Sequence, residues 1–539
     1  MYPFPMSIPV NDPIQSYAPG DAARERLQKR LNQMASERIE IPCIINGKEV
    51  RTGKTIDVVM PHAHGEVLAK VHMAGEKEIR QAAQAALDAK ASWERLPWEK
   101  RGDIFLKAAD LLAGEWRDVL NAATMLGQSK NVYQAEIDAA CELIDFLRFN
   151  VYYYQQVQKE QPLSVPGANN SLQYRALEGF VLAISPFNFT AIGGNLSGAP
   201  ALVGNTVVWK PSETQALSAY YTMKLFEKAG LPPGVINFVP AEGPLLGNIL
   251  IPHRDLAGIH FTGSTGTFRH IWKQVAGNLE NYRTYPRLVG ETGGKDFVFA
   301  HPSADWESLA TALSRGAFEF QGQKCSAASR AYIPRSLWNR VQERVVGDLK
   351  TMKMGDTRDF SNFVNAVIDE KSFNRISGYL DFAKNSPDAK ILSGGKGDKT
   401  KGYFIEPTVI LTEKPDFKTM QEEIFGPVLT VMVYDDAKLD ETLAICDRTS
   451  PYALTGAIFA QDRAAVQMMS DRLLHAAGNF YINDKPTGAT VGQQPFGGAR
   501  ASGTNDKAGS HLNLLRWISP RTVKENLQPP KDYRYPFLG

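Results

Sequence analysis

A single cysteine, Cys325, lies in the stretch GQKCSA and is the first candidate for chemistry in this sequence. A thiolate is a strong nucleophile, but a free cysteine with a pKa of about 8.5 is only a few per cent ionised near neutrality unless its surroundings help. Isolated cysteines are also common as small buried apolar residues. The stretch alone therefore leaves a nucleophile and a buried structural residue equally open.

Two further residues have side chains that suit steps of nucleophilic chemistry. Glu291, in VGETGGKD, precedes a Gly-Gly pair in a segment flanked by apolar runs. A carboxylate beside such backbone can act as a general base through water, although a surface turn with one acidic residue would read the same way. Asn188, in PFNFT, follows an apolar run, and the N–H of its side-chain amide can stabilise an oxyanion.

Two segments that end β-type runs have the composition of nucleotide-binding turns. Ser264 lies in FTGSTGTF, where a Gly/Ser/Thr turn leads into a helical pattern whose N-terminus suits a pyrophosphate. This turn is not GxGxxG, and alone it is a weak signal. Lys210 and Glu213 lie in VVWKPSET. At the carboxyl end of a parallel strand such a pair can hold ribose hydroxyls, or the SET stretch can cap a helix.

Size, charge and cysteine content limit the classes of function. With 539 residues the chain exceeds what one hydrophobic core usually organises, so two or more domains are expected. The 60 basic and 58 acidic residues give a net charge of +2, which predicts no electrostatic attraction to nucleic acid or to an anionic membrane. Four cysteines without ligand spacing argue against a disulfide framework. We expect no metal site, because His62 and His64 lack ligand partners.

The N-terminal segment MYPFPMSIPVNDP has neither the basic and apolar regions of a secretory signal nor the Arg/Ser-rich composition of a transit peptide. We therefore expect a cytoplasmic protein, or a mitochondrial-matrix protein if the chain is a processed mature form. Residues 179–209 carry no charge, but Pro186 and Pro200 interrupt them. Short apolar runs of this kind favour buried strands and tight loops over a membrane span.

The elements expected to position these residues form two α/β series. Between residues 179 and 290 the β-type runs FVLAIS, NTVVWK, GVINFVP and AGIHFTG alternate with helical patterns. That alternation predicts a parallel sheet covered by helices. After residue 295 a second series begins, with the runs DFVFAH, TVILTE, LTVMVYD, GAIFAQD and NFYINDK. We therefore predict a second α/β domain with its own sheet.

The order of these motifs, more than any one of them, resembles the aldehyde dehydrogenase superfamily. The resemblance spans roughly residues 40–520 and includes EEIFGPV at 422–428. Six motifs occur in order, and their key residues are Asn188, Lys210 with Glu213, Ser264, Glu291, Cys325 and Glu423. The resemblance implies an α/β aldehyde dehydrogenase fold.

Within the superfamily, the stretches ATMLGQSK, GETGGKDFVFAH and VGQQPFGGARASGTNDKAG are similar to the branch that oxidises L-glutamate γ-semialdehyde. The resemblance implies a Rossmann-like NAD-binding domain at 20–157 and 178–292 and an α/β catalytic domain at 293–504. It also implies a β-flap for oligomerisation with a C-terminal arm, at 158–177 and 505–539. The chain would then be a homo-oligomer, at least a dimer.

The resemblance also implies a catalytic role for three residues. Cys325 attacks the aldehyde carbon to give a hemithioacetal, whose oxyanion is held by the Asn188 side chain and the Cys325 backbone N–H. Hydride transfer to NAD leaves a thioester, and Glu291 activates the water that releases the acid. The product from glutamate γ-semialdehyde would be L-glutamate.

Cofactor and substrate contacts are implied in the same way. For NAD, Lys210 and Glu213 would hold the adenosine ribose, Ser264 the pyrophosphate and Glu423 the nicotinamide ribose, with Phe425 beside it. A carboxylate at Glu213 favours NAD over NADP because it repels a 2′-phosphate. The implied substrate contacts are Ser326, Gly488 and Ala489 for the α-carboxylate, Phe189 and Phe496 for the aliphatic stem, and Glu142 for the α-ammonium group. For Glu142, a solvated helix face is the competing interpretation.

Three other functions stay open at this point. One is an aldehyde dehydrogenase for another semialdehyde, against which the loop TGATVGQQPFGG, with backbone amides suited to an amino-acid head group, argues. A CoA-acylating enzyme would not need Glu291, the hydrolytic base. A non-catalytic relative would tolerate loss of Cys325, Asn188 or Glu291, and all three are present.

Overall fold

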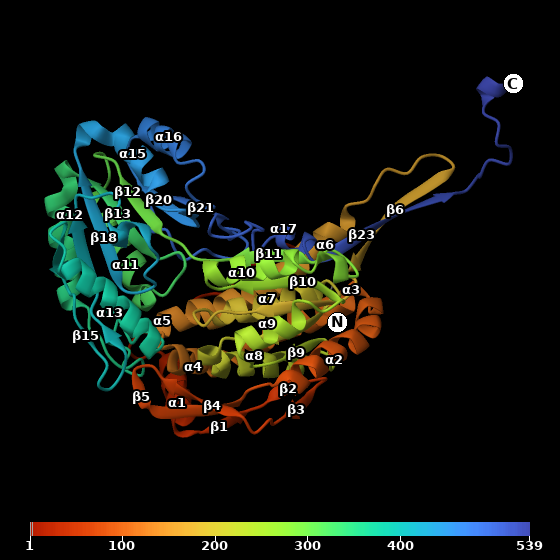
Figure 1. Ribbon diagram of the computed structural model, residues 1–539, viewed down its shortest axis with the longest axis horizontal. Helices are drawn as coiled ribbons and strands as arrows, with labels where there is room; N and C mark the ends of the chain where they lie inside the picture. The colour runs from red at the N-terminus through yellow and green to blue at the C-terminus, as the bar shows by residue number, and fades with distance from the viewer. Residues whose placement is uncertain (1, 3) are drawn as a thin grey trace.

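The computed structural model describes residue 2 and residues 4–539. Two seven-stranded sheets, each covered by helices, make up most of the chain (Figure 1). The strands of the first sheet come from residues 43–291 and those of the second from residues 296–482. A long two-stranded ribbon projects from the body next to the C-terminus. These two layered units correspond to the two α/β series that the sequence predicts.

The first sheet has the strand order β11–β10–β7–β8–β9–β2–β3. The strands from β11 to β9 are parallel, whereas β2 is antiparallel to both β9 and β3. The four predicted β-type runs are confirmed as β7 to β10. The strands are β2 (Cys43–Ile45), β3 (Lys48–Val50), β7 (Phe180–Ile184), β8 (Thr206–Lys210), β9 (Ile236–Phe238), β10 (Leu256–Thr262) and β11 (Arg287–Glu291).

Helices bury both faces of this sheet, as the continuous apolar strands require. In β7, Val181 and Ala183 face one core, whereas Phe180 and Leu182 face the other. The first core includes side chains of α1 (Ala22–Ser36), α3 (Trp98–Ala113), α4 (Arg117–Gln128), α6 (Leu143–Lys159), α7 (Thr190–Leu202) and α8 (Ala216–Ala229). The second includes those of α2 (Glu76–Arg95), α9 (Gly243–Leu250) and α10 (Thr265–Ala276).

The second sheet has the order β14–β17–β18–β13–β12–β20–β21 and is parallel except for β14. One face packs on α11 (Trp306–Phe318) and α12 (Arg335–Thr351). The other packs on α13 (Glu370–Lys384), α15 (Leu439–Arg448) and α16 (Arg463–Arg472). The strands are β12 (Asp296–Ala300), β13 (Ala328–Pro334), β14 (Ala389–Ser393), β17 (Thr408–Thr412), β18 (Val428–Tyr434), β20 (Thr455–Phe459) and β21 (Asn479–Ile482).

Smaller elements complete the described chain. A three-stranded sheet, β1–β5–β4, lies beside α1 and α4. The remaining strands and short helices are β1 (Ile39–Ile41), β4 (Thr55–Met60), β5 (Ala63–His72), α5 (Val132–Ala135), β15 (Gly397–Asp398), β16 (Phe404–Ile405), α14 (Lys418–Gln421), β19 (Tyr452–Ala453), β22 (Ala499–Arg500) and α17 (His511–Leu515).

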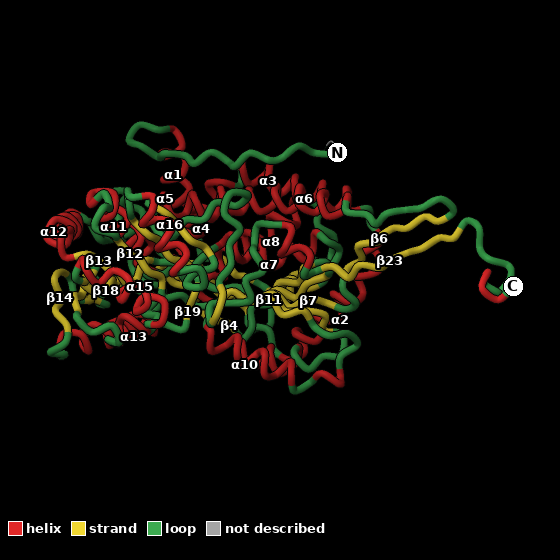
Figure 2. Tube along the Cα trace, turned by 90° about the horizontal axis from the view of Figure 1, so that it is seen from above, coloured by secondary structure: helices red, strands yellow, loops and turns green. Residues whose placement is uncertain are grey.

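The projecting ribbon joins two segments that are far apart in the sequence. Strand β6 (Ala168–Ala176) pairs antiparallel with β23 (Ile518–Asn526) along its whole length. Figures 1 and 2 both show this pair extending away from the body, with the C-terminal residues beyond it. Leu163 and Val165, in the segment that runs to the far end of the ribbon and bonds to the start of β6, are exposed. Of the helices in the described part of the chain, none combines the length and the apolar character needed to cross a membrane.

Candidate active site

Cys325 lies in a loop of unusual backbone conformation between α11 and β13. Phe320, Gln321 and Gly322 have φ angles of 50°, 56° and 64°. Left-handed conformations are costly for residues with a side chain, and runs of them persist only where the surroundings enforce them. A Cβ on Gly322 would overlap the carbonyl oxygen of Gly426. The loop is therefore pressed against the segment that precedes β18.

The side-chain amides of Gln321 and Gln323 hold this loop in place. Gln321 Nε2 donates to the carbonyl oxygens of Ser129 and Ala366, at 3.0 and 2.8 Å, and its Oε1 accepts from a backbone N–H. Gln323 Oε1 accepts from the N–H of Ile368 at 2.9 Å. Both glutamines are buried, so these hydrogen bonds take the place of bonds to water. They hold the loop to Ser129 and to the segment of Ala366 and Ile368.

Cys325 is a free cysteine and a partly exposed residue, whereas the other three cysteines are buried. Its pKa is raised well above the ordinary value, first by burial and then by the acidic side chains of Asp296, Glu423 and Glu291. A Cβ on Gly294 would overlap the Cys325 carbonyl oxygen, so only glycine allows this close approach. Cys325 is thus the one partly exposed cysteine in the described chain, and its thiol lies among carboxyl groups.

Asn188 and the nucleophile loop are joined by one hydrogen bond. Asn188 follows β7, and its Nδ2 donates to the carbonyl oxygen of Gln323 at 3.1 Å. Asn188 is itself buried, at 3% exposure. An amide group is therefore held two residues from Cys325, where it can reach an oxygen formed at the thiol.

Glu291 is the last residue of β11, at the carboxyl edge of the first sheet. Its Oε2 accepts from the N–H of Gly498 at 3.1 Å. The pKa of Glu291 is raised well above that of an ordinary glutamate, chiefly by burial and also by Asp506, whereas the Gly498 bond and Lys507 act in the opposite direction. A carboxyl group with a raised pKa accepts a proton more readily when it is ionised.

The first sheet changes winding direction between β7 and β10. The chain proceeds outward from β7 to β8 and β9, and then returns to place β10 on the other side of β7. Ligands of open parallel sheets bind in the crevice at such a switch point, at the carboxyl ends of the strands. The loop of Asn188 and the turn of Ser264 leave the sheet at this point, from β7 and β10.

Ser264 and the Lys210–Glu213 pair line the same edge. Ser264 is the N-cap of α10, and its Oγ accepts from the N–H of Thr267 at 3.2 Å. Lys210 ends β8 and lies 2.8 Å from Glu213 Oε1, measured from its Nζ. A Cβ on Gly266, in the first turn of α10, would meet open space. These groups offer a helix N-terminus to phosphates and a Lys–Glu pair to hydroxyls.

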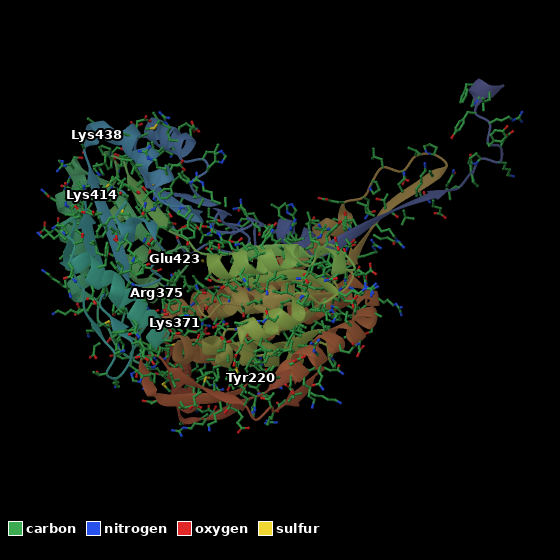
Figure 3. All side chains as sticks on the ribbon, viewed as in Figure 1. Tyr220, Lys371, Arg375, Lys414, Glu423 and Lys438 are labelled. Atoms are coloured by element: carbon green, nitrogen blue, oxygen red, sulfur yellow. The ribbon has the colours of Figure 1, made fainter. Side chains whose placement is uncertain are left out.

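Glu423 lies between the two sheets, and Figure 3 shows it where their helical layers meet. Its Oε1 accepts from the N–H of Gly294 at 3.0 Å, and burial raises its pKa. Phe425 has a φ of 56°, and its ring lies edge-on to that of Phe187 with centroids 5.7 Å apart. Lys295 is buried nearby, with no hydrogen-bond partner for its Nζ. Glu423 therefore lies against the Gly293–Gly294 turn that follows Glu291.

The loop of Gly488 and Ala489 is attached to the residue that follows the nucleophile. Ser326 Oγ and Thr487 Oγ1 lie 2.8 Å apart. Gly488 has a φ of 93°, a conformation that favours glycine. Gly488 is exposed and Ala489 is partly exposed, so their backbone N–H groups remain accessible to a ligand.

Glu142 is partly buried among charged residues and does not lie on a solvated helix face. It ends a π-helix, η1 (Glu136–Glu142), that the sequence pattern of an ordinary helix did not predict. Its pKa is raised to about 8, by burial first and then by Asp138, whereas Lys130 and Lys324 act in the opposite direction. π-Helical turns of this kind frequently mark functional positions.

Phe189 and Phe496 occupy different parts of the site. The Nζ of Lys130 lies 4.0 Å from the centroid of the Phe189 ring and 4.5 Å from that of Phe320. Phe496 pairs with Ala508 through backbone hydrogen bonds of 3.0 and 2.8 Å. Both aromatic side chains are partly exposed.

Sequence reasoning missed the buried charges around these residues. Lys130 is fully buried and forms a 2.7 Å ion pair with Asp138, whose carboxylate accepts from two N–H groups at the start of α7. Glu319 pairs with Lys324 at 3.1 Å and with Lys485 at 2.8 Å. An isolated lysine in a polar stretch of sequence looks like a surface residue. The one sequence signal for this buried cluster was that Lys324 is adjacent to Cys325 in the chain.

Comparisons with known proteins agree with this geometry. The family model described as Aldehyde dehydrogenase family matches residues 49–523. A Dictyostelium discoideum protein named delta-1-pyrroline-5-carboxylate dehydrogenase, mitochondrial, is 55% identical over 98% of this chain and 96% of its own. The human protein of the same name is 51% identical over 98% of this chain and 94% of its own.

A solved structure matches equally well. The Mycobacterium tuberculosis delta-pyrroline-5-carboxylate dehydrogenase bound with NAD superimposes with a TM-score of 0.96 and is 52% identical, covering 99% of each chain. The expected α/β aldehyde dehydrogenase fold is thereby confirmed. The chain belongs to the aldehyde dehydrogenase family.

Proposed function

We propose that this protein oxidises L-glutamate γ-semialdehyde, the ring-opened form of 1-pyrroline-5-carboxylate, to L-glutamate with NAD, in proline catabolism. The observation that carries the proposal is the 2.8 Å contact between Ser326 and Thr487. It connects the nucleophile loop to the exposed backbone of Gly488, so an aldehyde at Cys325 and a carboxylate at Gly488 can belong to one molecule. Relatives named for this activity, about half identical over nearly the whole chain, support the same reading.

In the first half of the reaction the Cys325 thiol gives up its proton to solvent, and its sulfur adds to the aldehyde carbon. The negative charge that develops on the carbonyl oxygen is stabilised by Asn188 Nδ2, which the loop after β7 holds close to the nucleophile. NAD supplies the hydride acceptor when bound. Loss of hydride from the carbon of the hemithioacetal then leaves a thioester on Cys325.

In the second half Glu291 takes a proton from water, and the resulting hydroxide attacks the thioester carbon. The C–S bond breaks, the carboxylic acid is released, and the departing sulfur takes up the proton from Glu291 to restore the thiol. The bond from Gly498 holds the carboxyl group at the edge of the crevice. Ser326, Gly488 and Ala489 would bind the α-carboxylate, and Glu142 would bind the α-ammonium group. Phe189 and Phe496 would flank the aliphatic stem. For NAD, the proposed contacts are Lys210, Glu213, Ser264, Glu423 and Phe425.

Replacing Glu213 is expected to weaken the preference for NAD over NADP. The Glu213 carboxylate forms an ion pair with the Lys210 ammonium at 2.8 Å. The Glu213→Gln variant removes a negative charge that would repel a 2′-phosphate. It also frees Lys210 to attract that phosphate. We expect the ratio of kcat/KM for NAD to that for NADP to fall by about tenfold. The Glu227→Gln variant, which breaks a similarly spaced Lys224–Glu227 pair on α8, should leave the ratio unchanged. An unchanged ratio in Glu213→Gln would contradict the ribose assignment.

The hydrolytic half-reaction should depend on pH through Glu291. The base works only as a carboxylate, so deacylation should slow as the pH falls and Glu291 becomes protonated. Because burial raises the pKa of Glu291, this slowing should begin at a higher pH than it would for an ordinary glutamate. The decay of acyl-enzyme in single turnovers measures this step separately from ionisation of Cys325. A decay rate that stays constant down to about pH 5 would argue against Glu291 as the base.

We further propose how the chain divides into domains and how it assembles into an oligomer. The division is an NAD-binding domain at 20–157 and 178–292, a catalytic domain at 293–504, and a flap with a C-terminal arm at 158–177 and 505–539. The exposed β6–β23 ribbon, which leaves the body, supports a role in forming at least a dimer. Sedimentation of the intact protein and of a chain truncated after Trp517 tests this role, since loss of the ribbon should yield monomers.

The proposed reaction is tested by its stoichiometry. Incubation of the protein with 1-pyrroline-5-carboxylate and NAD should yield L-glutamate and NADH in equal amounts, with no coenzyme A required and no hydrogen peroxide or acyl-CoA formed. Chromatography of the products and absorbance at 340 nm measure the two yields. NADH without glutamate, or no NADH at all, would contradict the proposal.

A further inference from the structure

A segment near the N-terminus runs over the outside of the helices that cover one face of the first sheet, before α1 begins. We call residues Asn11–Tyr17 the strap. Figure 2 shows the N-terminal chain running along the outside of α3 and α1. The strap has no regular secondary structure, and it is bonded to side chains on α4, η1 and α6 and to the loop of Val491 and Gln493.

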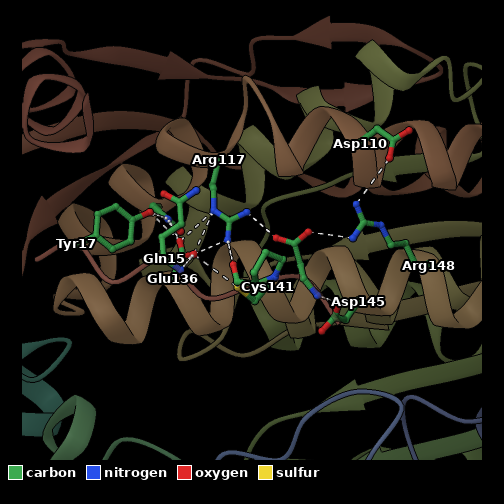
Figure 4. Close-up of polar contacts among 11 residues, drawn as sticks. Gln15, Tyr17, Asp110, Arg117, Glu136, Cys141, Asp145 and Arg148 are labelled. Carbon is green, nitrogen blue, oxygen red and sulfur yellow. Dashed lines mark hydrogen bonds and ion pairs between the residues drawn. The ribbon is translucent and has the colours of Figure 1, made fainter. Parts of the chain in front are cut away.

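One end of the strap is anchored on the π-helix. Glu136, the first residue of η1, forms a buried ion pair with Arg117 and accepts from the Gln15 N–H at 2.9 Å and the Tyr17 hydroxyl at 2.8 Å (Figure 4). The last residue of the same π-helix is Glu142, the proposed partner of the substrate's α-ammonium group. The strap therefore braces the element that carries half of the head-group site.

The centre of the strap is anchored by Asp12. Its carboxylate lies 2.6 Å from an Arg117 nitrogen and 2.9 Å from an Arg148 nitrogen, and its N–H donates to Asp145 at 2.8 Å. The Asp12 side chain is only 7% exposed. Breaking a buried, hydrogen-bonded charge pair leaves an uncompensated charge, so this part of the strap is firmly held.

The other end of the strap holds the loop that carries the second half of the site. Asn11 Nδ2 donates to the Val491 carbonyl oxygen and to Asp145 Oδ2, each at 2.7 Å. Asn11 Oδ1 accepts from Gln493 Nε2 at 2.9 Å. Val491 and Gln493 follow Gly488 and Ala489, the proposed α-carboxylate site, within five residues.

We infer that Asn11 is a specificity-determining positioning residue that fixes the loop of Gly488 and Ala489 at the correct distance from Glu142. Its side-chain amide joins α6, which continues directly from the π-helix, to the loop that faces the substrate carboxylate. The strap thus sets the spacing between the two groups of the protein that bind the α-carboxylate and the α-ammonium of the substrate. It does so without touching the substrate. This inference rests on the proposed function, because it needs a substrate with both charges.

The test compares two aldehydes in the Asn11→Ala variant of the full-length protein. For glutamate γ-semialdehyde, which uses the head-group site, we expect KM to rise about tenfold, with kcat within about twofold of the unaltered protein, because two loop hydrogen bonds are lost. For propanal, which has no head group, both constants should stay within about twofold. A merely structural role for Asn11 would lower the activity toward both aldehydes together.

The matched control is Gln155→Ala. Gln155 also bonds the N-terminal chain to α6, through the Met6 N–H at 2.7 Å and the Met6 carbonyl at 3.0 Å. It lies ten residues after Asp145 on α6, about 15 Å away along the helix axis. Gln155→Ala should leave the ratio of the two kcat/KM values unchanged. The same change of ratio in both variants would overturn the assignment to Asn11.

Other outcomes are also decisive. An unchanged KM for glutamate γ-semialdehyde in Asn11→Ala would overturn the inference while the proposed function stood. If Asn11→Ala does not fold, the Gln493→Ala variant tests the inference instead. Gln493 is exposed, and replacing it removes the hydrogen bond to Asn11 from the loop side. This variant should raise the same KM by about threefold and spare propanal, and no rise would overturn the inference. If the unaltered protein did not oxidise glutamate γ-semialdehyde, the proposed function would fail first.

Discussion

The Cys325→Ala variant is expected to lose aldehyde oxidation almost completely, by roughly four orders of magnitude or more in kcat. Cys325 is the one partly exposed cysteine in the described chain, and its loop is fixed by the buried Gln321 and Gln323 amides. Alanine removes the sulfur that forms the covalent bond and leaves those contacts in place. Binding of NAD, followed by quenching of protein fluorescence, should be nearly unchanged.

The Cys446→Ala variant is the control for this experiment. Cys446 is buried in the core beneath the second sheet and takes no part in the crevice. It should keep its turnover, although a small cavity lowers its stability by about 1 kcal/mol. Oxidation of the aldehyde by Cys325→Ala at more than a few per cent of the normal rate would refute the nucleophile assignment.

The Glu291→Gln variant is expected to form the acyl-enzyme and then stall. Glutamine preserves the size of the side chain and can still accept the Gly498 N–H bond, but it cannot take a proton from water. The first turnover should therefore release a burst of NADH close to one per subunit, followed by a steady rate lower by about two to three orders of magnitude. Intact-protein mass spectrometry should detect the acyl group on the protein.

An exposed carboxylate gives the matched control for this variant. Glu242 pairs with Lys54 at the surface, and Glu242→Gln should behave like the unaltered protein. If the acyl-enzyme of Glu291→Gln decayed as fast as that of the unaltered protein, water would be activated elsewhere. Asp506 would then be the next carboxyl group to test, because it lies near enough to raise the Glu291 pKa.

The elements and motifs of this chain could largely be predicted from its sequence. Strands β7, β8 and β10 are apolar runs that end at Pro, Gly or polar residues, so their position and type are visible without a partner. Cys325, Glu291 and Asn188 were recognisable because they occur in a characteristic order. The structure adds that Asn188 is bonded to the loop of Cys325 from the loop that follows β7, a strand of the other sheet.

Features that depend on distant contacts could not be predicted. Nothing in the residue types at Phe320 and Gln321 signals left-handed backbone, which the contacts of Gln321 with Ser129 and Ala366 impose. Each hydrogen bond of the π-helix spans one residue more than in an α-helix, a difference that a short periodic pattern does not reveal. The strap has no periodicity, and Asn11 contacts Val491 across 480 positions of sequence.

The most direct test of the proposed function is a comparison of kcat/KM for glutamate γ-semialdehyde, succinic semialdehyde and propanal, with NADH measured at 340 nm. We expect a preference for glutamate γ-semialdehyde of a hundredfold or more, about 2.7 kcal/mol, since only this substrate places charges at both Glu142 and Gly488. Equal values for the three aldehydes, or a preference for either simpler one, would contradict the account of the head-group site.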